Sequence, residues 1–341
     1  MREQVTTHPT GSAQPRKVAV LLYGMLRTFE VTAHSFHRHI VAPNDADVFY
    51  FGPHHSDVPT TRHNGHLDWF GNLKNNPKGL VDPVTTVNVQ SFLKAYSPAI
   101  RDYRFHHVDS QEFVRQGSLV PPRDWIFGLN PARIFSMVFN IEGAVNLLHE
   151  YEAAHGVSYD AVLITRPDIA FFSTIQAQVK SGFLHIPSGE GFDPWGRKHR
   201  GNARVLYYKS VETGDFIEGG DALTFNDQIF LLAREDLRCF SNLSKAVADY
   251  LSQGVPASPE TILYLHLCLR ARLRPITHRE WCYQIHRAGM RTVENVTDTS
   301  MIRVVDRYHY KAKEQFRRNA LACTMRDAKI LVKKLIHRLT R

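Results

Sequence analysis

Residues 159–172 combine a short apolar run with a charged triplet, and they constrain the fold more than any other part of the chain. Residues 162–165 are aliphatic or β-branched, a composition typical of a strand buried inside a sheet. The triplet Arg166-Pro167-Asp168 ends this strand, because proline has no N–H group to donate to a sheet ladder. Open α/β sheets bind their ligands just outside the carboxyl ends of such strands. The alternative is an ion pair at the strand end that binds nothing.

The order of the apolar segments predicts a mostly parallel, doubly wound α/β sheet. We expect a first strand within 17–29 that leads into a turn with Gly24 and Arg27, and further strands at 47–52, 102–108 and 160–165. Helices are expected from about Thr32, over 89–96, and from Pro131 to Gly156. The last helix carries an apolar stripe at spacings of 4, 3, 4 and 3: Ile134, Val138, Ile141, Val145 and Leu148. A stripe of this kind faces the core.

The second half of the chain is less regular. Residues 182–208 are rich in glycine, proline and aromatic residues with weak periodicity, and 223–233 read as a strand interrupted by Asn226-Asp227-Gln228. Helices are expected over 236–253 and 259–272. Earlier in the chain, a long polar loop over 53–89 contains four histidines whose spacing matches no zinc site: His54, His55, His63 and His66.

The net charge of +9 is concentrated at the C-terminus. Residues 307–341 hold 11 basic and 2 acidic side chains, so the remainder of the chain is neutral. Within 319–341, apolar positions recur at spacings of 4, 3, 4, 3 and 4: Leu321, Met325, Ala328, Val332, Leu335 and Leu339. This predicts a basic amphipathic helix suited to an anionic membrane surface. The alternatives are a helix packed on its own domain or a coiled coil. Nucleic-acid binding is disfavoured, because 319–341 contain no Phe, Tyr or Trp for base stacking.

The cysteines and the N-terminus favour a reducing compartment. The four cysteines are widely spaced and form no CxxC motif: Cys239, Cys268, Cys282 and Cys323. Residues 1–16 are polar, which is typical of a disordered lead-in and not of a secretory signal, and no window approaches 18 consecutive apolar residues. We therefore expect a cytoplasmic protein, or one held peripherally on the cytoplasmic face of a membrane.

Several short motifs between residues 17 and 283 resemble one enzyme class. They are Gly24-Met25-Leu26-Arg27 after the first strand, ADVFYFG, the helix over 132–151, YDAVLITRPDI, NDQIF and SPETIL. In order and spacing they resemble bacterial GT-A glycosyltransferases, close to the WavE-like proteins of lipopolysaccharide and capsule synthesis. The resemblance implies a Rossmann-like GT-A fold over 17–300, with a donor half (17–172) and an acceptor half (173–300), followed by the basic helical tail at 301–341. It also implies transfer of a sugar from a nucleotide-sugar donor to a glycan or lipid-linked acceptor.

The resemblance also implies a donor site. GT-A enzymes carry an Asp-x-Asp triplet after the strand equivalent to 162–165, and its second Asp usually holds a divalent metal. Here the triplet is Arg166-Pro167-Asp168, so Asp168 would ligate Mn²⁺ or Mg²⁺. Arg166 instead offers a guanidinium that matches phosphate directly, which leaves metal dependence open. Tyr23, Gly24 and Arg27 complete the expected site, although a turn needs glycine for steric reasons as well.

Three acidic residues are candidates for the base that deprotonates the acceptor hydroxyl, in the order Asp227, Glu260 and Asp221. Glu260 has a structural alternative, because Ser258-Pro259-Glu260 is also a good helix N-terminus. Two alternative functions remain from the sequence. One is a non-catalytic relative that keeps the fold, and the other is a nucleic-acid- or membrane-binding protein that uses the basic C-terminal helix.

Overall fold

The computed structural model describes residues 17–55, 86–121, 131–187, 225–255, 257–278, 281 and 283–286, together with the backbone of 207–209 and 216–218. Several predictions concern residues outside this part of the chain. They are the lead-in at 1–16, His63 and His66, Asp221, Cys282 and Cys323, and the tail at 301–341.

A seven-stranded sheet organises the described residues. Its strands follow the order β10 (Arg274–His278), β6 (Phe183–Pro187), β9 (Ile229–Ala233), β4 (Ala161–Thr165), β1 (Val18–Tyr23), β2 (Asp47–Pro53) and β3 (Ile100–His106). Neighbouring strands run parallel except where β9 pairs with β4 and with β6. Two short ribbons accompany the sheet, β5 (Ile169–Phe171) with β11 (Tyr283–Ile285) and β7 (Tyr207–Lys209) with β8 (Phe216–Glu218). The mostly parallel α/β sheet is confirmed and is compatible with a Rossmann-like fold.

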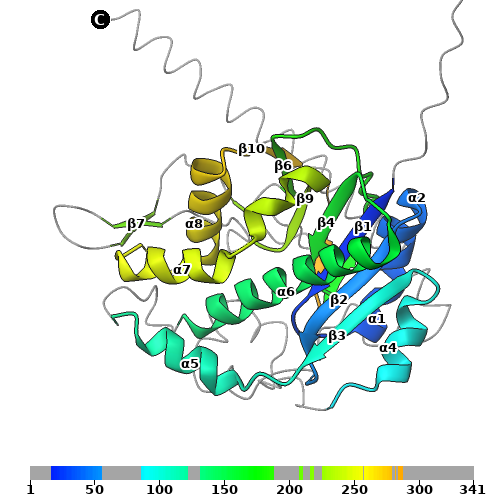
Figure 1. Cartoon of the computed structure of the whole chain (residues 1–341), viewed down its shortest axis with the longest axis horizontal. Coiled ribbons are helices and arrows are strands. Elements are labelled where there is room, and N and C mark those ends of the chain that lie inside the picture. Colours follow the sequence, from blue (N-terminus) through cyan, green and yellow to red (C-terminus); the bar gives the residue numbers. More distant parts are fainter. Residues whose placement is uncertain are drawn as a thin grey trace, which may run out of the picture.

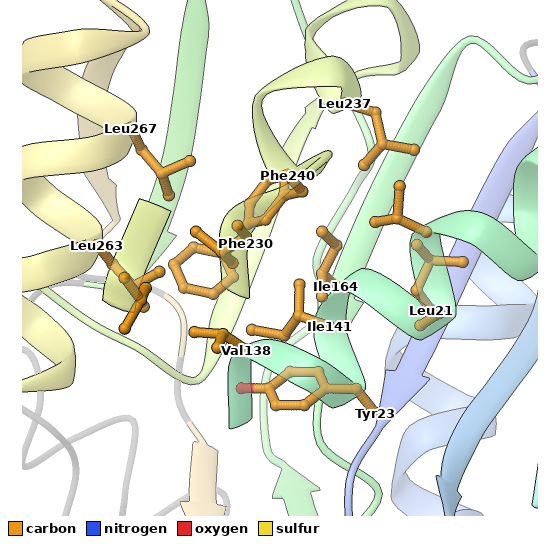
Figure 2. Packing of buried hydrophobic residues seen from close by; sticks show 14 of the residues in the cluster. Leu21, Tyr23, Val138, Ile141, Ile164, Phe230, Leu237, Phe240, Leu263 and Leu267 are labelled. Atoms are coloured by element: carbon orange, nitrogen blue, oxygen red, sulfur yellow. The ribbon is translucent and has the colours of Figure 1, made fainter. Parts of the chain in front are cut away.

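Helices cover both faces of the sheet (Figure 1). They are α1 (Phe29–Phe36), η1 (His37–Val41), α2 (Ala42–Asn44), α4 (Val89–Tyr96), α5 (Ser110–Ser118), α6 (Ala132–His155), η6 (Arg234–Phe240), α7 (Leu243–Ser252), α8 (Pro259–Leu263) and η7 (Tyr264–Arg270). Alternate residues of β1 enter two separate apolar clusters. Leu21 packs on the side of α6, α7 and α8, whereas Leu22 packs on the side of α1 and α4. Figure 2 shows Leu21 beside Ile141 and Ile164 in the first cluster.

The strongest sequence patterns predicted the elements well. The helix expected from Pro131 is α6, its apolar stripe is buried, and Gly156 ends it with a positive φ of 63°. The strands over 47–52 and 160–165 and the helix over 89–96 are also present. The strand expected at 102–108 runs instead from Ile100 to His106.

The less regular half contains the errors. Only Ile229–Ala233 of the predicted 223–233 strand is extended, because the Asn226 side chain accepts a hydrogen bond from Gln228 N (2.8 Å) and bends the chain. The helix predicted over 236–253 is divided into η6 and α7 at Asn242, whose φ is 59°. The helix expected from Pro259 begins there and continues through the π-helical η7 to Arg270. Within 182–208, the strand β6 was not predicted.

The strand order determines where ligand-binding residues can meet. The chain passes from β1 to β2 and β3 on one side and then returns to β4 on the other side of β1. The carboxyl ends of β1 and β4 therefore lie together, with Leu22 paired to Thr165. Such a change of direction creates a crevice at the carboxyl edge of the sheet. Because β9 is antiparallel and pairs Ile229 with Thr165, the residues just before β9 reach the same edge.

Candidate functional site

The turn after β1 has an unusual backbone. Gly24 has a φ of 84°, its N–H donates to the Phe51 carbonyl (3.0 Å), and its own carbonyl accepts from the Tyr50 hydroxyl (2.9 Å). Arg27 also has a positive φ, 44°, which is uncommon for a residue with a side chain. The steric need for glycine at position 24 is confirmed. The turn directs the Arg27 side chain toward the end of β4.

Asp168 is the centre of a buried ion triad. Its side chain has no solvent exposure and lies between two arginines. Arg166 binds it through two parallel hydrogen bonds, Nε to Oδ1 (2.9 Å) and Nη2 to Oδ2 (2.7 Å). Arg27 Nη1 donates to Oδ2 from the other segment (3.0 Å). The two guanidiniums compensate the buried carboxylate and leave the triad with one net positive charge.

The Arg27 and Arg166 side chains are largely buried, with 13% and 22% of their surface exposed. Burial acts to lower the pKa of Arg166. The negative charge of Asp168 and its hydrogen bonds outweigh burial and raise this pKa above its ordinary value, with further contributions from Tyr23 and Asp227. Arg166 is therefore a permanent cation at the carboxyl edge of the sheet.

The backbone of the triplet is held by residues that the sequence did not indicate. His286 N donates to the Asp168 carbonyl (2.7 Å), and the Thr28 hydroxyl donates to the His286 carbonyl (3.1 Å). The Thr32 hydroxyl donates to the Pro167 carbonyl (2.6 Å). Thr28 and His286 are 258 positions apart, so no local pattern could have linked them. Pairing of β11 with β5 brings His286 to the site.

Asp227 lies at the same edge, directly before β9. The Tyr23 hydroxyl donates to the Asp227 carbonyl (2.9 Å), and the Asn226 amide donates to the Tyr283 hydroxyl. The negative charge of Asp227 also contributes to raising the pKa of Arg166. The structure thus brings together Tyr23, Gly24, Arg27, Arg166, Asp168 and Asp227 from the predicted set.

Glu260 is buried at the start of α8. The Ser258 hydroxyl donates to Glu260 Oε2 (2.6 Å) and accepts from Thr261 N (3.4 Å). The predicted N-cap at Ser258 is therefore confirmed. A catalytic role of Glu260 stays a prediction.

Tyr96 is a further residue that the sequence did not indicate. It belongs to α4 and is buried among aromatic rings, including that of Phe36 at 5.7 Å. Burial and then the nearby charge of Asp168 raise the pKa of its hydroxyl. Tyr96 is thus a neutral phenol on the apolar side of the triad.

The expected metal fits this arrangement poorly. Both oxygens of Asp168 already accept hydrogen bonds from guanidiniums, so a cation would have to displace a buried, positively charged partner. In the described segments, no three His, Cys, Asp or Glu side chains form a group that could hold a metal ion. The groups around Asp168 are mainly guanidinium N–H donors, which are not metal ligands.

Comparison of the chain with protein-family models gives no match, and neither does comparison with curated proteins. Among the helices that the structure describes, none is both long enough and apolar enough to cross a membrane. Functional reasoning therefore depends on the residues at the carboxyl edge.

Proposed function

We propose that this protein is a glycosyltransferase of the GT-A type that moves a sugar from a nucleotide-sugar donor to a glycan or glycolipid acceptor, as in surface polysaccharide synthesis. The observation that carries the proposal is the Arg27–Asp168–Arg166 triad at the junction of β1 and β4. A pair of guanidiniums on partly exposed side chains suits the diphosphate of a sugar nucleotide. Its place at a change of strand direction is where open α/β sheets bind nucleotides.

In this mechanism Asp168 is a positioning residue. Its two oxygens hold the guanidiniums of Arg27 and Arg166 in a fixed orientation before the donor binds. The two guanidiniums then contact the diphosphate and stabilise the charge that develops on it as the bond to the sugar breaks. Since the cations are already in place, no reorganisation is needed at the moment of reaction.

Asp227 acts as the base. Its carboxylate takes the proton of the acceptor hydroxyl while the hydroxyl oxygen forms a bond to the anomeric carbon. The electron pair of the broken bond leaves with the nucleoside diphosphate. The Tyr23 hydroxyl holds the Asp227 backbone at 2.9 Å and so fixes the base relative to the donor site.

The first test is thermal unfolding of the full chain with a panel of nucleoside diphosphates and sugar nucleotides, in manganese and in chelator. A ligand at about 100 times its dissociation constant adds roughly 2.7 kcal/mol to stability. A selective shift that survives chelator supports binding by the guanidiniums. A shift that requires manganese supports a metal ion bound by Asp168. The absence of a shift with every donor would contradict the proposal.

A second measurement separates the enzyme from a non-catalytic relative. Release of nucleoside diphosphate from the donor that gives the largest shift is followed in the presence of a glycan mixture. Turnover supports the transferase, whereas binding without turnover identifies a protein that keeps the site and has lost the reaction.

A further inference from the structure

The amino-terminal ends of β6 and β10 lie on the side of the sheet opposite the candidate site. A group of basic and aliphatic side chains that the proposed function does not use lies there. We call it the basic edge; it consists of Lys180, Leu269, Arg270, Arg272, Arg274 and Ile276. Because β10, β6 and β4 run parallel, the start of β10 lies at the amino edge and Asp168 lies at the carboxyl edge. Figure 1 shows β10 and β6 together at one end of the sheet.

Local contacts bring Lys180 and Arg274 to the start of the same pair of strands, β6 and β10. Arg274 pairs with Phe183 across β10 and β6, and its N–H donates to the Gly182 carbonyl (2.9 Å). Lys180 Nζ lies 5.9 Å from the centre of the Phe183 ring. Beside them is an open groove of about 580 Å³, lined by Gln178, Val179, Lys180, Phe183, His185 and Ile276.

Three of the four cations of the basic edge make no ion pair with a described residue, whereas the negative charge of Asp249 acts on the fourth, Arg270. Lys180, Arg272 and Arg274 make no salt bridge with another described residue. Arg270 donates to the Tyr250 hydroxyl (3.3 Å). The acid at this turn, Asp236, is buried and accepts from Gly182 N (2.7 Å).

Large aliphatic side chains are exposed among these cations. Leu269 is 57% exposed and Ile276 is 37% exposed, both on the segment that carries the three arginines. Aliphatic groups interspersed with basic ones suit the headgroup region of an anionic bilayer, where both contributions add. Addition of a peptide strand to β10 is disfavoured, because Pro275 lacks an N–H donor.

We propose that the basic edge docks the protein on a membrane surface that contains anionic lipids. Docking leaves the crevice with Asp168 on the side away from the bilayer, so the inference does not depend on the proposed enzymatic function. It is also independent of the tail at 301–341, for which the sequence predicted a membrane contact.

The test is cosedimentation of the full chain with vesicles of phosphatidylcholine, with and without phosphatidylserine. Wild-type protein should bind only the anionic vesicles, and salt should weaken this binding. Each arginine near the surface changes partitioning about fivefold, so Arg272→Gln with Arg274→Gln should reduce binding about 30-fold. Lys94→Gln with Lys245→Gln is the matched control, because it removes the same charge from exposed positions on α4 and α7.

A third variant, Lys333→Gln with Lys334→Gln, reports on the tail. A selective loss for the arginine pair supports the basic edge. Equal losses for the arginine pair and the control, a loss confined to the tail variant, or no binding by the wild type would each overturn the inference. Thermal unfolding of the three variants should match the wild type, since Arg272 and Arg274 are exposed.

Discussion

Arg27 Nη1 lies 3.0 Å from Asp168 Oδ2, although 141 positions separate the two residues. The contact joins the turn after β1 to the end of β4 and completes a triad whose other arginine, Arg166, is local to Asp168. One carboxylate therefore orients two cations from different segments. The expected behaviour of substitutions follows from this division of roles.

Asp168→Asn should destabilise the protein strongly. Residue 168 has no solvent exposure, so the change leaves two guanidiniums facing a buried neutral amide. Removing one partner of a buried ion pair lowers the free energy of unfolding by about 3–5 kcal/mol. Urea unfolding measures the change in the free energy of unfolding. The control is Glu150→Gln, which removes the ion pair between Glu150 (56% exposed) and Arg104 (49% exposed). Its loss should lower the free energy of unfolding by less than about 1 kcal/mol. Equal costs would contradict the role given to Asp168.

Arg166→Lys should weaken nucleotide binding while keeping the charge. Lysine cannot make the two parallel hydrogen bonds to Asp168 and offers no fork to a diphosphate, so we expect about a tenfold loss of affinity. Calorimetric titration with the nucleotide measures it. Arg234→Lys is the matched control, because Arg234 makes a forked ion pair with Glu152 away from the crevice. The control should lose stability and keep its affinity; an equal loss of affinity would argue against a specific site.

Asp227→Asn should separate binding from turnover. The amide cannot accept the proton, so turnover should fall by about 10²–10⁴, while the thermal shift with donor persists. Tyr23→Phe removes the hydrogen bond to the Asp227 carbonyl, so turnover should fall less than in Asp227→Asn. The free energy of unfolding should fall by about 1 kcal/mol. Glu260→Gln serves as the comparison. If Glu260→Gln abolishes turnover and Asp227→Asn does not, the base has been assigned to the wrong acid.

Gly52→Ala should disturb the turn after β1 from a distance. A Cβ at position 52 would lie 2.2 Å from the Tyr50 hydroxyl and 2.3 Å from the Gly24 carbonyl, so the backbone must shift. We expect a loss of about 1–3 kcal/mol together with weaker nucleotide binding. Gly156→Ala is the control, because a Cβ there meets nothing within 4 Å and only the positive φ is strained. It should lose stability and bind nucleotide normally.

Stability should fall between about pH 7 and pH 5, in part through His266. Burial lowers the pKa of this imidazole, as does Arg270, although its hydrogen bond to the Cys239 carbonyl raises it. Nε2 must donate to that carbonyl (2.7 Å), and the neutral Nδ1 accepts from the Tyr250 hydroxyl (3.0 Å). Since the folded pKa is below the unfolded one, the unfolded chain takes up the proton first as the pH falls. Urea midpoints of His266→Gln should depend less on pH than those of the wild type; an unchanged dependence would contradict this.

Local sequence determined much of this fold. The strand that ends at Arg166-Pro167-Asp168, the stripe of α6 and the cap at Ser258 all depend on residues within a few positions of one another. Burial periodicity, missing donors and capping hydrogen bonds act over that range, so their signals survive in the sequence. The pairing of Arg166 with Asp168 is of this kind.

Only the tertiary structure decided which of these local features meet. Arg27 reaches Asp168 because β1 and β4 pair in register, and Asp227 reaches Tyr23 because β9 runs antiparallel. The Asn226 side chain, which bends the chain before β9 through a local hydrogen bond, is also held by Tyr283, 57 positions away. Strand order and register arise from burying two apolar clusters at once, a property of the whole chain that no short segment records.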